Sequence, residues 1–244
     1  MATLVMFVDY DNVERGLTRA GPVAFAKTLA TLVPPDVLAR HDSLVARLYG
    51  GWRMQGNLTT AAQRLVPDIR AGSPAMVGNS HVGFAARTRL SVELADRPIW
   101  SSRPLEETFV RNRELRAFRA RERGWAACTS PNACGLNQFI SLSHRTTCAT
   151  PGCLSCLADV FVRDEQKMVD TMIVADIAHQ VLNGRATDIV VVSSDTDMWP
   201  GVLLAVQAKC RVTHVHTRAA WRTQRHLLNT LDLSASSYYQ QLSV

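Results

Sequence analysis

Carboxylates follow two strongly apolar segments that lie far apart in the chain. Residues 4–8 run directly into Asp9, and residues 189–192 are followed closely by Asp195 and Asp197. Uninterrupted β-branched and aliphatic runs of this kind are typical of strands buried on both faces of a parallel sheet. The carboxyl ends of parallel strands meet at one edge of the sheet, where ligands bind. Because clustered carboxylates repel one another unless a cation neutralises them, the pattern predicts a divalent metal site.

The spacing of residues around these acids predicts which side chains lie together. Asn12 lies three residues after Asp9, and we expect both side chains to face one crevice, with Asp11 directed elsewhere. Asp195 and Asp197 are two residues apart, so their side chains share a side if the backbone between them is extended.

A further acid comes from residues 167–182, where apolar residues recur at helical spacing. Asp170 lies in the first turn of this predicted helix, close to Lys167. Asp176 follows six residues later, about 120° around the helix, so the two acids do not easily bind one ion directly. We expect Asp170 to be the metal ligand and Asp176, on the apolar stripe, to be buried and hydrogen-bonded. Stabilisation by the helix dipole is the alternative role for Asp170.

The remaining pattern predicts alternating helices and strands. We expect helices at residues 22–33, 58–69, 167–182 and 202–208, and strands at residues 4–8, 43–49, 85–94, 189–192 and 211–216. This order indicates an α/β sandwich with a central, mainly parallel sheet. The chain has 244 residues, of which 47% are hydrophobic, which is enough for one domain with an insertion. No segment has the length of a membrane span or the features of a signal peptide, so we expect a cytoplasmic protein.

Residues 98–164 break this alternation and are predicted to be an inserted segment rich in arginine. On a helix, Arg116, Arg119 and Arg123 would share one face and offer a track for nucleic-acid phosphates. The alternative is a solvated helix with Glu–Arg pairs. The net charge of +6 agrees either with a polyanionic partner or with a merely basic surface.

The same insertion contains a cysteine cluster. Its members are Cys128, Cys134, Cys148, Cys153 and Cys156. The last two have the spacing of a zinc knuckle, and the first two can supply the other pair of ligands. Tetrahedral Zn²⁺ needs four ligands, so one cysteine is surplus, and Cys148 is the expected one, with His144 as an outside candidate ligand. Disulfides are the alternative, which a cytoplasmic location disfavours.

Three motifs, taken together and in this order, resemble the NYN domain, a branch of the PIN-like nucleases that includes LabA-type bacterial proteins. The motifs are Asp9-x-x-Asn12, Lys167-x-x-Asp170 with Asp176, and Ser193-x-Asp195-x-Asp197. The resemblance covers the first strand and residues 167–216. Ser194 stands where the family usually has glycine, and Met198 where it prefers phenylalanine. Residues 52–164 have no counterpart in the family pattern.

The resemblance implies one PIN-like, three-layer domain over residues 1–244 and an endoribonuclease that depends on Mg²⁺ or Mn²⁺. Its substrate would be single-stranded or loop RNA. The implied metal ligands are Asp9, Asp170, Asp195 and Asp197.

Other residues would support this chemistry. Asn12 would orient Asp9 or a water, Ser193 would bond a ligand carboxylate, and Lys167 would contact phosphate or pair with Asp170. Asp11 and Asp176 are supporting residues. Trp52, Trp125 and Trp199 offer stacking surfaces for bases, although core packing is the better interpretation of each.

Two rival functions remain open at this stage. Asp9 and Asp11 also fit a haloacid dehalogenase-type phosphatase, with Asp9 as nucleophile and Asp11 as acid. Against it, Ser193 follows Lys167 in the chain, whereas those enzymes have their Ser or Thr before the lysine. The other rival is a non-catalytic protein that binds RNA or assembles with partners or copies of itself. Four carboxylates that repel phosphate argue against it.

Overall fold

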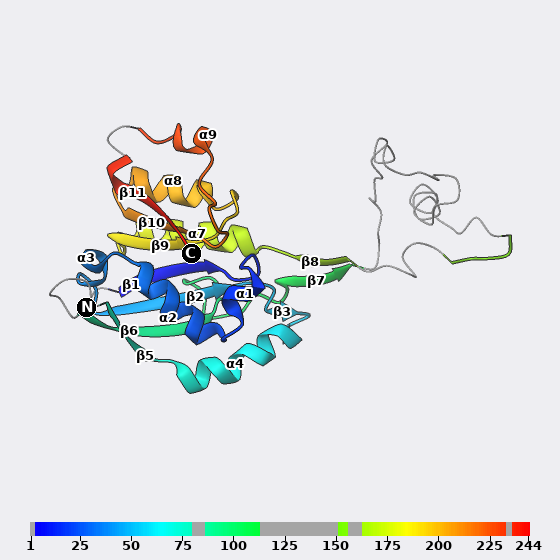
Figure 1. Ribbon diagram of the computed structural model, residues 1–244. Helices are drawn as coiled ribbons and strands as arrows, with labels where there is room; N and C mark the ends of the chain where they lie inside the picture. The colour runs from blue at the N-terminus through cyan, green and yellow to red at the C-terminus, as the bar shows by residue number, and fades with distance from the viewer. Residues whose placement is uncertain (1–2, 80–85, 113–150, 156–162, 233–235) are drawn as a thin grey trace. The chain divides into compact units, whose positions relative to one another are not determined.

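The computed structural model describes residues 3–79, 86–112, 151–155, 163–232 and 236–244 (Figure 1). The chain divides into two compact units, one formed by residues 1–109 and 166–244 and the other by residues 110–165. Residues 98–109, expected in the insertion, belong to the first unit. Thr108 shows why: its hydroxyl accepts a hydrogen bond from the Arg53 backbone N–H (2.9 Å), and its carbonyl accepts one from the Lys167 backbone N–H (3.0 Å).

The first unit is built around a seven-stranded sheet with the order β11-β10-β9-β1-β2-β6-β5 (Figure 1). Its strands are β1 (Thr3–Asp9), β2 (Ser43–Tyr49), β5 (Ala75–Asn79), β6 (Ala86–Leu94), β9 (Asp188–Val192), β10 (Arg211–His216) and β11 (Tyr239–Ser243). Strand β5 runs antiparallel to β6, and the other neighbours are parallel. The expected α/β fold with a mainly parallel sheet is confirmed. The chain first extends the sheet from β1 towards β6 and later returns to place β9 on the other side of β1. The carboxyl ends of the neighbouring strands β1 and β9 therefore form a topological switch point of the sheet.

Helices cover both faces of the sheet, an arrangement that fits three layers. The longer helices are α2 (Pro22–Leu32) and α4 (Thr60–Gly72) on one face, and α7 (Val169–Leu182) and α8 (Trp199–Gln207) on the other. The shorter elements are α1 (Arg15–Thr18), α3 (Pro35–Leu38), α9 (Arg225–Leu228), a 3-10 turn (Ser236–Tyr238), the paired strands β3 (Arg53–Met54) and β4 (Asn57–Leu58), and the pair β7 (Phe109–Asn112) and β8 (Arg163–Gln166). Among the described residues, no helix combines the length and the apolar character needed to cross a bilayer.

The alternation of side chains along the central strands decides which polar groups meet. Val5 and Phe7 of β1 pack in the core beneath α7 and α8, and Asp9 lies two residues further on, so its side chain emerges on the same face. Val191 of β9 belongs to that core as well, and Ser193 follows it by two residues. Since β1 and β9 are parallel neighbours with Phe7 opposite Val191, Asp9 and Ser193 leave the sheet side by side.

Among the helix boundaries that differ from the predicted ones, the starts of two helices lie near the acids. The helix expected from Lys167 begins at Val169, because Met168 takes a left-handed conformation with φ of 62°. The helix expected from Val202 begins at Trp199, because Pro200 is accommodated in its first turn. Both shifts lie at the sheet edge that carries the acids.

Candidate functional site

Asp9 is a buried carboxylate whose two oxygens have different surroundings. Its Oδ2 accepts hydrogen bonds from Asn12 Nδ2 (2.9 Å) and from Ser193 Oγ (2.7 Å), while its Oδ1 is buried with no partner among the described residues. The structure thus places Asn12 and Ser193 beside Asp9, where the sequence predicts them. Burial raises the pKa of Asp9, and the charges of Asp195 and Asp11 add to this effect, whereas the two hydrogen bonds oppose it.

Asp170 faces the same group of negative charges from the first turn of α7. Burial and then the charges of Asp9, Asp195 and Asp197 raise its pKa to about 6. Its Oδ1 is also buried and has no hydrogen-bond partner among the described residues. The four acids predicted as ligands therefore act on one another, and Asp170 feels all of the other three. Such mutual repulsion is what a bound cation would relieve.

Asp195 and Asp197 lie in a turn that leads from β9 into α8. The Asp197 backbone N–H donates to Asp195 Oδ1 (3.2 Å), and the Trp199 N–H donates to the Thr196 carbonyl (2.9 Å). The backbone is therefore not extended here, and the condition for both side chains to share a side is not met. Asp195 is partly buried and Asp197 is exposed. Within the described ranges, no three Asp, Glu, His or Cys side chains are arranged to hold a metal ion.

Asp11 and Lys167 point to neighbours outside the acidic group, which consists of Asp9, Asp170, Asp195 and Asp197. Asp11 Oδ2 accepts hydrogen bonds from the Gly51 backbone N–H (2.6 Å) and from Gln166 Nε2 (2.9 Å), so its carboxylate is directed elsewhere, as the sequence predicts. The Lys167 side chain is exposed, and in the part of the chain that the structure describes it forms no ion pair with Asp170.

Asp176 is a structural acid on α7. It is fully buried; its Oδ2 accepts a hydrogen bond from the Tyr49 hydroxyl (2.7 Å) and lies 3.5 Å from Arg47, and its Oδ1 accepts one from the Ile99 N–H (2.9 Å). Both oxygens are thus satisfied by partners from β2 and from the segment after β6. This matches the expectation of a buried, hydrogen-bonded side chain.

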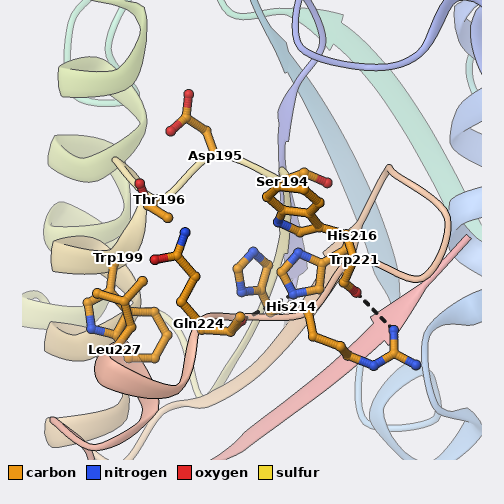
Figure 2. A pocket seen from close by; sticks show the side chains of 11 residues that line it. Ser194, Asp195, Thr196, Trp199, His214, His216, Trp221, Gln224 and Leu227 are labelled. Carbon is orange, nitrogen blue, oxygen red and sulfur yellow. Dashed lines mark hydrogen bonds between the residues drawn. The ribbon is translucent and has the colours of Figure 1, made fainter.

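A cleft borders the acidic group on the side of β10. Figure 2 shows an adjoining pocket, which shares Ser194, Asp195, Thr196, Trp221 and Gln224 with this cleft. The lining of the cleft consists of Asn12, Ser194, Asp195, Thr196, Arg218, Trp221 and Gln224. The last three were not predicted from the sequence. A signal existed, because they follow β10, whose carboxyl end lies at the same sheet edge as that of β9.

His214 is a buried histidine near this edge and has a structural role. His214 Nε2 lies 3.0 Å from the Ser193 carbonyl, which can only accept, so this nitrogen carries the proton. Burial and the neighbouring His216 lower the pKa of His214 to about 3, which keeps it neutral at pH 7. Its other nitrogen pairs with the Tyr239 hydroxyl (3.0 Å). His214 thereby fixes the backbone that carries Ser193.

Several predicted residues lie outside this site. Those outside the described residues are Arg116, Arg119, Arg123, Trp125, Cys128, Cys134, His144, Cys148 and Cys156. Cys153 is described and carries no disulfide. Trp52 and Trp199 are buried, and their ring N–H groups donate to the Leu48 carbonyl (2.6 Å) and to Thr230 Oγ1 (3.0 Å), so both pack in the core.

Comparisons with protein-family models, with curated proteins and with solved structures gave no match for this chain. The chemistry of the acidic group and its cleft is therefore the basis on which a function is inferred.

Proposed function

We propose that the chain is a metal-dependent endoribonuclease that hydrolyses phosphodiester bonds of single-stranded or loop RNA. The observation that carries this proposal is the unpartnered, buried Oδ1 of Asp9 at the switch point of the sheet, beside Asp170 and its raised pKa. A buried carboxylate oxygen without a donor is costly for the fold. A divalent cation with oxygen ligands would satisfy it and neutralise the surrounding acids. The motif order of an NYN-type, PIN-like domain agrees with this interpretation.

The residues that would hold Mg²⁺ or Mn²⁺ are Asp9, Asp170, Asp195 and Asp197. Because the described residues contain no preformed metal cluster, the more exposed Asp195 and Asp197 must turn towards the other two when an ion binds. Asp9 is held in place for this role. When bound, the ion would supply an activated water and offset the negative charge that builds up at the scissile phosphate.

The chain's own polar groups have separate tasks in this mechanism. Asn12 and Ser193 occupy Oδ2 of Asp9 and leave Oδ1 free for a ligand. The Lys167 side chain is exposed and lies close to Asp170 in the chain, and the exposed Arg218 lines the adjoining cleft. Both cations would attract the phosphates of the substrate. No side chain has to attack phosphorus, which suits a site whose conspicuous groups are carboxylates. A structural Zn²⁺ on four of the five clustered cysteines stays a prediction.

The phosphatase alternative needs Asp11 as a mobile proton donor next to Asp9. Asp11 instead accepts hydrogen bonds from the Gly51 backbone N–H and from Gln166 Nε2 through one oxygen, and these fix its side chain. This contact favours the nuclease over the phosphatase.

A cleavage assay tests the proposal. Purified protein is incubated with end-labelled single-stranded RNA in Mn²⁺, in Mg²⁺ or in EDTA, alongside the Asp195→Asn variant. Asp36→Asn is a matched control, since Asp36 is an exposed carboxylate of α3. We expect cleavage with metal by the wild type and by the control, and none in EDTA or with Asp195→Asn. Cleavage that survives the chelator or the Asp195 substitution would contradict the metal-dependent mechanism.

A further inference from the structure

The cleft beside Asp195 offers a surface of a kind that the acidic group lacks. It combines an exposed aromatic ring, an exposed guanidinium and a free amide, from Trp221, Arg218 and Gln224. Its volume is about 200 Å³. This is smaller than the roughly 300–1,000 Å³ of pockets that enclose a drug-sized ligand, so the cleft suits a single planar group of a larger substrate.

Trp221 differs from the core tryptophans in its exposure. It is 37% exposed, whereas Trp52 and Trp199 are 1% and 6% exposed. The guanidinium of Arg218 lies 5.3 Å from the centre of the Trp221 ring, in cation–π geometry. An exposed tryptophan with an adjacent arginine is the combination that proteins use to stack the bases of single-stranded nucleic acids and to hold their phosphates.

The loop that carries Trp221 is anchored at both ends. At its start, Ser194 Oγ accepts hydrogen bonds from the backbone N–H groups of Thr217 (3.0 Å) and Arg218 (3.2 Å). At its end, the Thr223 N–H donates to Gln241 Oε1 (3.0 Å). Ser194 stands where the resembled family usually has glycine, and a glycine has no hydroxyl to make these bonds. The anchoring means that little ordering is needed when a ligand meets the ring.

Gln224 is placed to contact the edge of a planar ligand. In Figure 2 its amide points towards the side of the pocket where Thr196 and Asp195 lie. The amide makes no hydrogen bond to any other described residue, and it offers both donors and an acceptor. A base edge presents the complementary groups, so one glutamine distinguishes bases by their donor and acceptor pattern.

We propose that this cleft binds one unpaired nucleotide of the substrate strand, next to the phosphodiester bond that is cut. Trp221 stacks on the base, Gln224 contacts the base edge, and Arg218 pairs with a phosphate. The cleft shares Asn12 and Asp195 with the acidic group, which puts this nucleotide beside the scissile phosphate. The choice of ligand rests on the proposed nuclease function, whereas the stacking surface itself does not.

Fluorescence anisotropy with a labelled single-stranded RNA of about twelve nucleotides tests the cleft. Binding is measured in Mg²⁺ with Asp9→Asn as the parent protein, so that the proposed cleavage does not consume the probe. Adding Trp221→Ala should weaken binding about tenfold, in line with the loss of one base stack, and Trp221→Phe should retain most of the affinity. Trp100→Ala is the matched control, since Trp100 is 51% exposed and contacts the ring of His179 instead. Gln224→Ala should narrow the differences in affinity between strands that differ in one base.

The outcomes separate this inference from the proposed function. Equal affinity of the parent and the Trp221→Ala protein, or no binding by the parent, overturns the cleft as a nucleotide site, whatever the cleavage assay gives. Loss of binding in Trp221→Ala without any metal-dependent cleavage by the wild type would keep the cleft and contradict the nuclease. A fall in affinity of the same size in Trp100→Ala would also overturn the proposal.

Discussion

Asp9 and Asp188 are two buried aspartates at opposite ends of neighbouring parallel strands, and the chain treats them differently. Both are 1% exposed. Asp188 Oδ1 accepts hydrogen bonds from Arg40 and Arg211 (both 2.8 Å), and its Oδ2 lies 3.1 Å from His41 Nε2. These partners outweigh the cost of burial and lower the pKa of Asp188 to about 2. Asp9 has no cationic partner among the described residues, and its pKa is raised.

The two edges of the sheet thus differ in how buried negative charge is compensated. The chain has 27 lysines and arginines, so cations for a buried acid are abundant. At the amino end of β9 they neutralise Asp188 and contribute to stability. At the carboxyl end of β1, the neutral side chains of Asn12 and Ser193 donate hydrogen bonds to Oδ2 of Asp9, and Oδ1 has no partner among the described residues. Uncompensated charge of this kind is typical of a functional site, where stability is given up for ligand binding.

The largest expected effect is the loss of the proposed RNA cleavage in Asp9→Asn, comparable to that in Asp195→Asn. Loss of the charge at Oδ1 should lower the rate of RNA cleavage by about 10²–10³-fold, the size expected when a group that stabilises the transition state is removed. Its free energy of unfolding should change by less than about 1 kcal/mol, because the substitution also removes repulsion with Asp170 and Asp195. Cleavage time courses and urea unfolding measure the two effects. A large loss of stability without loss of activity would reverse the comparison.

Asp188→Ala should do the opposite. Removing this acid leaves His41 and the guanidinium groups of Arg40 and Arg211 without their shared partner. We expect the free energy of unfolding to fall by about 3 kcal/mol. Asp36→Ala provides the control: Asp36 pairs with the same Arg40 but its side chain is 71% exposed, so its loss should cost less than about 0.5 kcal/mol. Urea unfolding at pH 7 distinguishes the two. Equal effects would mean that burial of Asp188 has no special weight.

Asn12→Ala should have a smaller effect on the acidic edge. Without the amide, Asp9 keeps the hydrogen bond from Ser193 but loses its fixed orientation. We expect cleavage to slow by about tenfold, as for other residues that orient a metal ligand, with the dependence on Mn²⁺ concentration shifted upwards. An unchanged metal dependence would show that Asn12 does not act through Asp9.

The remaining expected effects are those of pH on stability, and they differ in sign. The pKa of Asp188 is lowered to about 2, so its contribution is complete above about pH 4, its unfolded value, and is lost as the pH falls towards 2. The pKa of Asp170 is raised to about 6, so without metal its ionisation lowers stability as the pH rises from about 4 to 6. Unfolding of wild type and Asp170→Asn in EDTA across this range checks the second effect. Asp170→Asn should remove that fall in stability, and an identical pH profile would contradict it.

The sequence predicts the sheet and the core of the site better than it predicts the cleft. The apolar runs before Asp9 and Asp195 suffice for β1 and β9, because strands buried on both faces need such runs. Alternation along them puts Asp9 and Ser193 on one face. The register and the spacing Asp9-x-x-Asn12 then account for the observed hydrogen bonds.

The features that were missed depend on contacts between distant residues. The loop that carries Trp221 is anchored by Ser194, which follows β9 and lies 23 residues before Thr217 in the chain, and no local pattern encodes this contact. The turn at residues 195–197 is set by a hydrogen bond from the Asp197 backbone N–H to the Asp195 carboxylate. The alternation of side chains between the two faces of the sheet therefore does not continue past the end of β9. The start of α7 is shifted by the left-handed backbone of Met168, which the apolar spacing of the helix does not predict.

Direct binding of Mn²⁺ tests the central claim, that the carboxyl edge is left uncompensated in order to hold a cation. Electron paramagnetic resonance of free Mn²⁺ gives the number of bound ions for wild type, Asp9→Asn and the control Asp36→Asn, all at pH 7.5. We expect one or two bound ions in the wild type and in the control, and their loss in Asp9→Asn. Binding that is the same in Asp9→Asn as in the wild type, or absent from the wild type, would contradict the account.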